Sequence, residues 1–165
     1  MAYFIIIRGP LGAGKSTVAE QLANALGAEN INIDTVLEQH GLDTAPPDAE
    51  CIPAENFVKA NEVILPRARA LLDHGRTVIF DAGFYHRKPI EHLIAHLPFR
   101  HYAFTLKAPV EVCVDRDRHR RKRHGEAAAR AVHSLVSRFD YGTSVDATKP
   151  LAEVVSYIRS ILPRK

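Results

Sequence analysis

Residues 9–16 read Gly-Pro-Leu-Gly-Ala-Gly-Lys-Ser and match the pattern GxxxxGK[ST], and Thr17 follows directly. Glycines allow successive backbone N–H groups to turn toward phosphate oxygens, and a helix that starts at Ser16 adds the positive end of its dipole. In this pattern Lys15 reaches the outer phosphates of a nucleotide, and the Ser16 hydroxyl binds Mg²⁺. A plain glycine-rich turn is disfavoured, because an apolar strand precedes the segment and an amphipathic helix follows it. The expected nucleotide-binding residues of this loop are Gly9, Pro10, Leu11, Gly12, Ala13, Gly14, Lys15, Ser16 and Thr17.

Two aspartates stand at the ends of short apolar segments that are typical of strands: Asp34 ends residues 31–34, and Asp81 follows residues 77–80. Asp34 could simply cap a helix, and Asp81 could close a turn. Parallel strands, however, end on the same sheet edge as the phosphate loop. This favours a base role for Asp34 and Mg²⁺ coordination by Asp81. Tyr85 and Arg87 follow Asp81 and are candidates to anchor a second substrate, although surface positions fit them nearly as well.

Most of the positive charge lies in one segment, residues 116–123 (RDRHRRKR), called the basic segment below. The chain has a formal net charge of +3, and the basic segment alone carries +5, so the remainder carries −2. Clustered cations repel one another, and a polyphosphate beneath them relieves that repulsion. We therefore expect a lid over a nucleotide rather than a solvated helix face. Arg118, Arg121 and Lys122 are expected to be spectators or contacts to a large anionic second substrate.

The hydrophobic pattern alternates strands with helices along the whole chain. Strands are expected over residues 2–7, 31–34, 77–80, 102–106 and 144–147, and the main helices over 16–26, 54–74, 88–96, 126–139 and 151–162, with another beginning near residue 109. Such alternation requires crossover connections, which predict a three-layer α/β/α fold with a parallel sheet covered on both faces. We see no linker, so residues 1–165 are expected to form one domain.

The bulk composition fits this prediction. A chain of 165 residues that is 46% hydrophobic can bury a core, which excludes disordered and collagen-like classes. The first apolar run is stopped by Arg8 and is too short for a membrane span or a signal sequence, so a cytoplasmic protein without membrane association is expected. Neither Cys51 nor Cys113 has the spacing of a metal site or disulfide framework, and no metal-ligand spacing is expected among the nine histidines.

Four segments together resemble the small P-loop kinase family, which includes shikimate, gluconate and adenylate kinases and polynucleotide 5′-hydroxyl kinases. They are GPLGAGKST, NINIDTVL, VIFDAGFYHRK and CVDRDRHRRKR, and the resemblance covers nearly the whole chain. The resemblance implies five parallel strands in the order 2-3-1-4-5, with a mobile lid at about residues 116–126. It also implies that the protein uses ATP and Mg²⁺.

The resemblance assigns roles to the residues that match. Asp34 is similar to the carboxylate that accepts the proton of the acceptor hydroxyl, and Asp81 to the carboxylate that holds Mg²⁺ through water. Arg116 and Arg120 resemble lid arginines that pack on the base and close on the transferring phosphoryl group.

Other positions limit or extend the resemblance. Lys149 and Pro150 occupy the place of the family's adenine-contacting loop, although Pro150 is explained equally well as the start of the last helix. Shikimate kinases carry a second Asp where this chain has Asn32, and three glycines where it has residues 81–83 (DAG). Nucleoside monophosphate kinases place an arginine after the second strand, and residues 36–38 (VLE) offer none. A hydroxyl group rather than a phosphate is therefore the expected acceptor.

Other nucleotide-binding classes fit less well. The sequence lacks the NKxD motif and the DxxG spacing of GTPases, and motor and AAA-type ATPases are expected to need a larger domain. The sequence therefore predicts an ATP- and Mg²⁺-dependent kinase acting on a hydroxyl of a small metabolite or nucleoside. Two alternatives stay open: a polynucleotide 5′-hydroxyl or RNA-directed kinase that uses the basic segment as a backbone clamp, and a nucleotide-binding regulatory ATPase.

Overall fold

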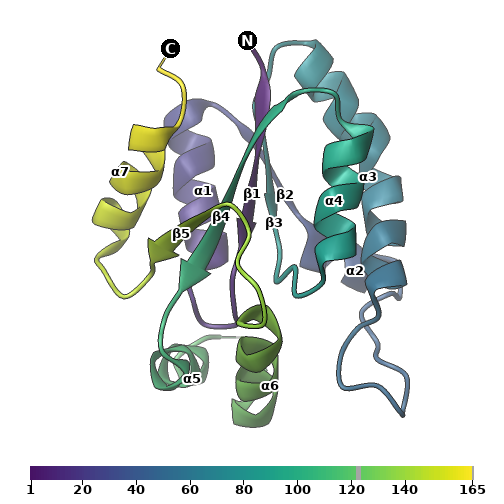
Figure 1. Ribbon diagram of the computed structural model, residues 1–165, viewed down its shortest axis with the longest axis vertical. Helices are drawn as coiled ribbons and strands as arrows, with labels where there is room; N and C mark the ends of the chain where they lie inside the picture. The colour runs from purple at the N-terminus through teal and green to yellow at the C-terminus, as the bar shows by residue number, and fades with distance from the viewer. Residues whose placement is uncertain (122–123, 165) are drawn as a thin grey trace.

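The computed structural model describes residues 1–121 and 124–164. Its strands are β1 (Tyr3–Arg8), β2 (Glu29–Asn32), β3 (Val78–Asp81), β4 (Arg100–Lys107) and β5 (Thr143–Asp146). Its helices are α1 (Lys15–Leu26), α2 (Ile33–Gln39), α3 (Ala54–Asp73), α4 (Arg87–His96), α5 (Val110–Arg118), α6 (Glu126–Val136) and α7 (Leu151–Ile161). The strands are parallel and follow the order β2-β3-β1-β4-β5 (Figure 1), which confirms the predicted fold class and topology.

Helices cover both faces of this sheet. In β1, Phe4 and Ile6 pack into the core shared with α2, α3 and α4, whereas Ile5 and Ile7 pack into the core shared with α1 and α7. All six residues of β1 are buried, as expected of a central strand with apolar side chains on both faces. The sheet therefore supplies a rigid base for whatever lies at the strand ends.

The carboxyl ends of the strands face α5 and α6, which lie beyond the sheet edge at the bottom of Figure 1. The loop between β1 and α1 lies at the same edge, as do the ends of β2 and β3. Within the described ranges, no helix is both long enough and apolar enough to cross a lipid bilayer.

Candidate active site

The phosphate loop connects the central strand to α1, in the arrangement that the motif predicts. Gly14 stands at the N-cap of α1 with a left-handed φ of 87°, and no side chain caps the helix. The amide of Ala13 donates to the Pro10 carbonyl at 3.2 Å, which closes the turn. The first-turn amides of α1 have no acceptor from a capping side chain, and amides so placed bind phosphate oxygens.

Gly12 fixes the phosphate loop against α5. A Cβ atom at Gly12 would lie 2.2 Å from the carbonyl oxygen of Cys113, and the φ of Gly12 is +80°. Only glycine fits both constraints, so the loop and α5 approach each other backbone to backbone.

We expect Gly12→Ala to weaken nucleotide binding by about tenfold or more, because the loop must move off α5 to make room. Gly27→Ala is the matched control: Gly27 also has a positive φ, +61°, but its Cβ would meet no atom within 4 Å. Its effect is expected to be limited to a stability loss of about 1 kcal/mol. Titration with a fluorescent ATP analogue measures nucleotide affinity, and thermal unfolding measures stability. An equal loss of nucleotide affinity in both variants would contradict the argument that Gly12 is needed for its close contact with α5.

Lys15 is buried, and its Nζ donates to the Pro10 carbonyl at 3.1 Å. Burial lowers the pKa of Lys15, while the charges of Asp34 and Asp81 oppose that shift. The ammonium group therefore lies within electrostatic reach of both carboxylates singled out in the sequence. The three groups come from α1, α2 and β3 and meet at one edge of the sheet.

Asp81 ends β3 beside Asn32 of β2 and Ile7 of β1, and its side chain is 1% exposed. Its Oδ2 accepts a hydrogen bond from Asn32 Nδ2 at 3.1 Å, while Oδ1 has no hydrogen-bond partner within 1–121 and 124–164. Burial raises the pKa of Asp81 to about 6, although Lys15 and the nearby Ser16 hydroxyl act in the opposite direction. A buried carboxylate oxygen without a partner beside a serine hydroxyl fits a Mg²⁺ site of the phosphate-loop type.

Replacement of Asp81 is expected to stabilise the protein in the absence of metal. Because the folded-state pKa is raised, the protonated carboxyl contributes stability below pH 4 that is lost as the pH rises through about 6. Asp81→Asn avoids that loss. Its unfolding free energy, measured by denaturant titration, should match the wild type near pH 4 and exceed it by up to about 3 kcal/mol at pH 7. Asp73→Asn, at an exposed position, is the control and should not reproduce this pH-dependent difference in unfolding free energy. A difference between Asp81→Asn and the wild type that does not depend on pH would contradict the raised pKa of Asp81.

Asp34 lies in the first turn of α2 and does not end the second strand. The prediction of a strand over residues 31–34 was wrong by two positions, because Asn32 stops β2 and caps α2 by accepting from the Thr35 amide at 2.9 Å. The interpretation of Asp34 as a helix cap is therefore also wrong. Its carboxylate instead accepts from the backbone N–H of Gly83.

The surroundings of Asp34 combine solvent access with partial desolvation by the protein around it. Its side chain is exposed to solvent, yet the protein around it displaces enough water to raise its pKa. Lys15, His124 and Arg120 act in the opposite direction. A carboxylate with a raised pKa that is held by a backbone amide and reached by solvent can accept a proton from a bound hydroxyl group.

The two residues predicted to anchor a second substrate follow β3. The Tyr85 hydroxyl accepts from the Ile52 amide at 3.2 Å, so it holds the loop that precedes α3. Arg87 is exposed at the start of α4, and its guanidinium lies 4.5 Å from the centre of the Phe139 ring. Directly before Tyr85, Phe84 has a positive φ of 45°, the strained conformation often found near functional sites.

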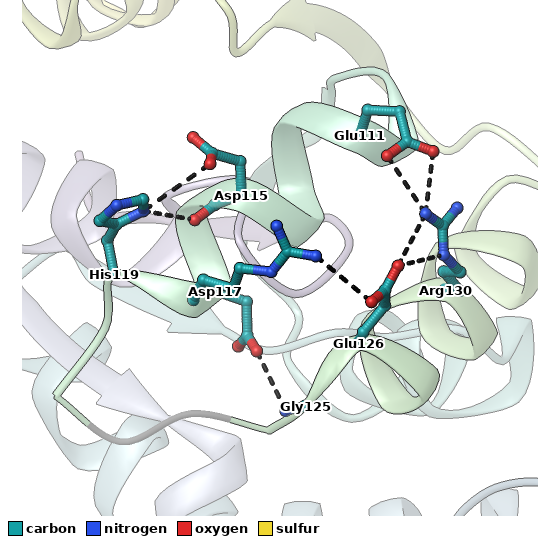
Figure 2. A network of polar contacts seen from close by, with 8 residues as sticks. Glu111, Asp115, Asp117, His119, Gly125, Glu126 and Arg130 are labelled. Atoms are coloured by element: carbon teal, nitrogen blue, oxygen red, sulfur yellow. Dashed lines mark hydrogen bonds and ion pairs between the residues drawn. The ribbon is translucent and has the colours of Figure 1, made fainter.

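Acidic side chains pair with arginines in and next to the basic segment. Arg118 pairs with Glu126 at 3.3 Å, and Arg130 of α6 bridges Glu126 and Glu111, both at 2.9 Å (Figure 2). Exposed pairs of this kind contribute little stability but reduce the local positive charge. Whether Arg118 is a spectator or a contact to a large anionic second substrate stays a prediction.

The two arginines assigned to the lid lie in different surroundings. Arg116 is half-buried on α5, near Cys113, whose pKa is raised by burial while the Arg116 charge opposes that shift. Arg120 follows α5, and its charge acts on both Lys15 and Asp34. The predicted lid at residues 116–126 includes Lys122 and Arg123, which lie outside the described residues. The neighbouring Arg121 is exposed.

A cavity of about 740 Å³ opens beside the phosphate loop. Pro10 lines one end, and the ends of β4 and β5 together with α6 form the walls. Thr148 lines the cavity directly before Lys149 and Pro150 in the chain, and Pro150 is the N-cap of α7. The cavity has the size of typical small-ligand sites.

Sequence reasoning missed the role of Arg8, which it treated only as the end of an apolar run. Arg8 is fully buried and donates to the carbonyls of Phe84, Val136 and Phe139 at 3.0–3.1 Å and to Thr105 Oγ1 at 3.1 Å. It therefore joins the end of β1 to the loop after β3 and to the end of α6. An arginine at the end of a buried strand directly before a phosphate loop was the available signal.

The expectation about histidine spacing also needs correction. His92 and His96 stand four residues apart on α4 with ring centres 4.2 Å apart, so a spacing used by metal ligands is present. Across the described parts of the chain, however, no three ligating side chains gather around one point.

Comparison with known proteins agrees with this geometry. Residues 4–141 match a family model described as an AAA domain. A 35-residue segment is 54% identical to a shikimate kinase of Actinobacillus pleuropneumoniae serotype 5b (strain L20), covering 21% of this chain and only 20% of that relative.

Solved structures extend the likeness to nearly the whole chain. A gluconokinase from Sinorhizobium meliloti 1021 superimposes with a TM-score of 0.68 at 21% identity, covering 92% of this chain and 86% of that one. A sugar kinase from Janibacter sp. HTCC2649 does so with a TM-score of 0.75 at 18% identity, covering 97% and 94%. At these identities the likeness concerns the fold.

The family match also corrects one exclusion. AAA-type proteins were excluded on the ground that they need a larger domain, yet the matching model fits within residues 4–141. Its match includes the phosphate loop, both aspartates and the basic segment. The chain therefore belongs to this AAA-domain family, and its fold is that of the small P-loop kinases.

Proposed function

We propose that the protein is an ATP- and Mg²⁺-dependent kinase that transfers the γ-phosphoryl group to a hydroxyl of a small metabolite or nucleoside. One observation carries the proposal: Lys15 of the phosphate loop lies within electrostatic reach of two carboxylates in different surroundings. Asp81 is buried, and its Oδ1 has no hydrogen-bond partner among the described residues, whereas Asp34 is open to solvent. A kinase that uses Mg-ATP needs one carboxylate that binds the metal and another that acts as the base.

The loop amides, Lys15 and the start of α1 hold the phosphates, and Ser16 and Asp81 hold Mg²⁺, which neutralises phosphate charge when bound. Asp34 orients the acceptor hydroxyl and takes its proton, while Arg116 and Arg120 balance charge at the phosphates. Tyr85 and Arg87 border the acceptor. The cavity beside Pro10 receives the nucleotide base, and Lys149 and Pro150 directly follow its lining residue Thr148 in the chain.

A small acceptor is favoured over a polynucleotide because Arg118 and Arg130 are paired with glutamates. These pairs leave fewer cations for a backbone clamp. Salt distinguishes the two: the affinity for a 5′-hydroxyl oligonucleotide that makes several phosphate contacts falls steeply between 50 and 200 mM salt, whereas the affinity for a small neutral acceptor changes little.

The direct test measures ADP formation from Mg-ATP with hydroxyl-bearing metabolites, nucleosides and 5′-hydroxyl oligonucleotides, each at low and moderate salt. We expect one class of small hydroxyl compounds to increase ADP formation well above slow hydrolysis and to appear as a phosphate ester. Slow hydrolysis that no acceptor changes, together with a protein partner bound only in the ATP state, would instead support a regulatory ATPase.

A further inference from the structure

Asp117 is an acid inside the basic segment, and its side chain is 2% exposed. Its two carboxylate oxygens accept from the backbone N–H of His124 at 3.3 and 3.2 Å. Oδ2 also accepts from the backbone N–H of Gly125 at 3.1 Å (Figure 2). Gly125 is the N-cap of α6. The buried carboxylate therefore holds the chain where it enters α6.

The same carboxylate orients the imidazole of His124. His124 Nδ1 lies 3.4 Å from Asp117 Oδ1, and the His124 side chain is 41% exposed, in contrast to its buried partner. A carboxylate on one ring nitrogen fixes the orientation of the ring. The other nitrogen, Nε2, is then the one that can bind a ligand.

Packing places this pair at the phosphate site. Cys113 and Asp117 are one helical turn apart and both buried, so they share the inner face of α5. That face touches the phosphate loop, because a Cβ at Gly12 would lie 2.2 Å from the Cys113 carbonyl oxygen. The charges of His124 and Arg120 also both act on Asp34. Arg120 and His124 thus lie within electrostatic reach of the proposed base.

We propose that His124, positioned by Asp117, donates a hydrogen bond from Nε2 to an oxygen of the phosphoryl group during transfer. This inference rests on the proposed kinase function. In the reaction the acceptor oxygen bonds to the γ-phosphorus, the bond from that phosphorus to the bridging oxygen of ADP breaks, and Asp34 takes the acceptor proton. His124 donates a hydrogen bond and transfers no proton, and Asp117 acts through His124 as a positioning residue.

The test uses a probe of the phosphoryl group in transfer that needs no acceptor. The affinity for fluorescent Mg-ADP is measured with and without aluminium fluoride, which mimics that group, and the ratio of the two affinities is compared among variants. His124→Asn keeps an amide near the Nδ1 position but cannot reach as Nε2 does. We expect it to reduce the ratio by about tenfold or more, and His124→Gln, whose amide reaches farther, to retain part of it.

A second pair on α5 gives a matched control. His119 and Asp115 lie 3.8 Å apart with side chains 76% and 69% exposed, facing away from the buried side of α5 (Figure 2). His119→Asn and Asp115→Asn should leave the ratio unchanged. Asp117→Asn should reduce the affinity ratio as His124→Asn does. The double variant should reduce the ratio by less than the two single effects combined, because both substitutions disrupt the same contact between Asp117 and His124.

The outcomes separate the inference from the function on which it rests. A wild-type protein whose ADP affinity aluminium fluoride does not increase would overturn both. An increase in the wild type that His124→Asn leaves intact would overturn the inference alone. Lower thermal stability of Asp117→Asn with an unchanged ratio would show that Asp117 only caps α6, which would overturn its positioning role.

Discussion

Lys15→Ala is expected to reduce phosphoryl transfer by about a thousandfold or more and to weaken ATP binding. Lys15 is the buried cation between the phosphate loop and the carboxylates of Asp34 and Asp81. Its removal leaves the negative charge that develops on the transferring group without the buried cation of the phosphate loop. It also removes the charge that opposes the raised pKa values of both aspartates.

The measurement combines turnover with nucleotide protection against thermal unfolding. Lys59→Ala, a change of the same type on the exposed side of α3, should behave as the wild type. In Lys15→Ala we expect the ATP-dependent increase in melting temperature to shrink strongly. Protection that survives at wild-type strength would count against the assignment of residues 9–16 as a phosphate loop.

The sequence predicts the parts of this protein that depend on local patterns. The loop at residues 9–16 requires glycines, a lysine and a serine in fixed order, and the central strand before it is buried on both faces. These patterns depend on interactions between residues that are close in the sequence. Strand order came from the resemblance, because alternation alone shows that the sheet is parallel but not which strands are adjacent.

Positions that depend on a competition between neighbouring residues are less predictable. Asn32 and Asp34 both favour the start of a helix, and the sequence does not show which of them caps α2. The structure selects Asn32, whose amide also donates to Asp81 across the sheet. This contact between β2 and β3 is tertiary, so no local pattern contains it. The selection leaves the Asp34 carboxylate available for chemistry.

Charge counting has a similar limit. The amino-acid sequence gives the net charge of the basic segment but not the burial of each residue. Asp117 lowers the sum by one in the sequence, whereas in the structure it is the buried centre around which His124 and Gly125 are arranged. Arg8 likewise marks the end of an apolar run in the sequence and is a fully buried contact among three segments in the structure.

Asp34→Asn is expected to lower kcat by about a hundredfold to ten-thousandfold while ATP affinity stays nearly unchanged. The amide can still accept the hydrogen bond from Gly83 but cannot take a proton from the acceptor hydroxyl. Phosphate binding depends on the loop and Lys15, so the substitution separates transfer from binding. Asp73→Asn, an exposed carboxylate at the end of α3, is the matched surface control.

The pH dependence of turnover distinguishes a base from a carboxylate that only orients the acceptor. Because the pKa of Asp34 is raised, the wild-type kcat should fall as the pH drops below that raised value, since the protonated carboxyl can no longer accept a proton. The residual activity of Asp34→Asn should lack this limb of the profile. An unchanged kcat in Asp34→Asn would refute the assignment of Asp34 as the base. A reduced kcat that keeps the same acidic limb of the pH profile would show that another group gives rise to that limb and takes the proton.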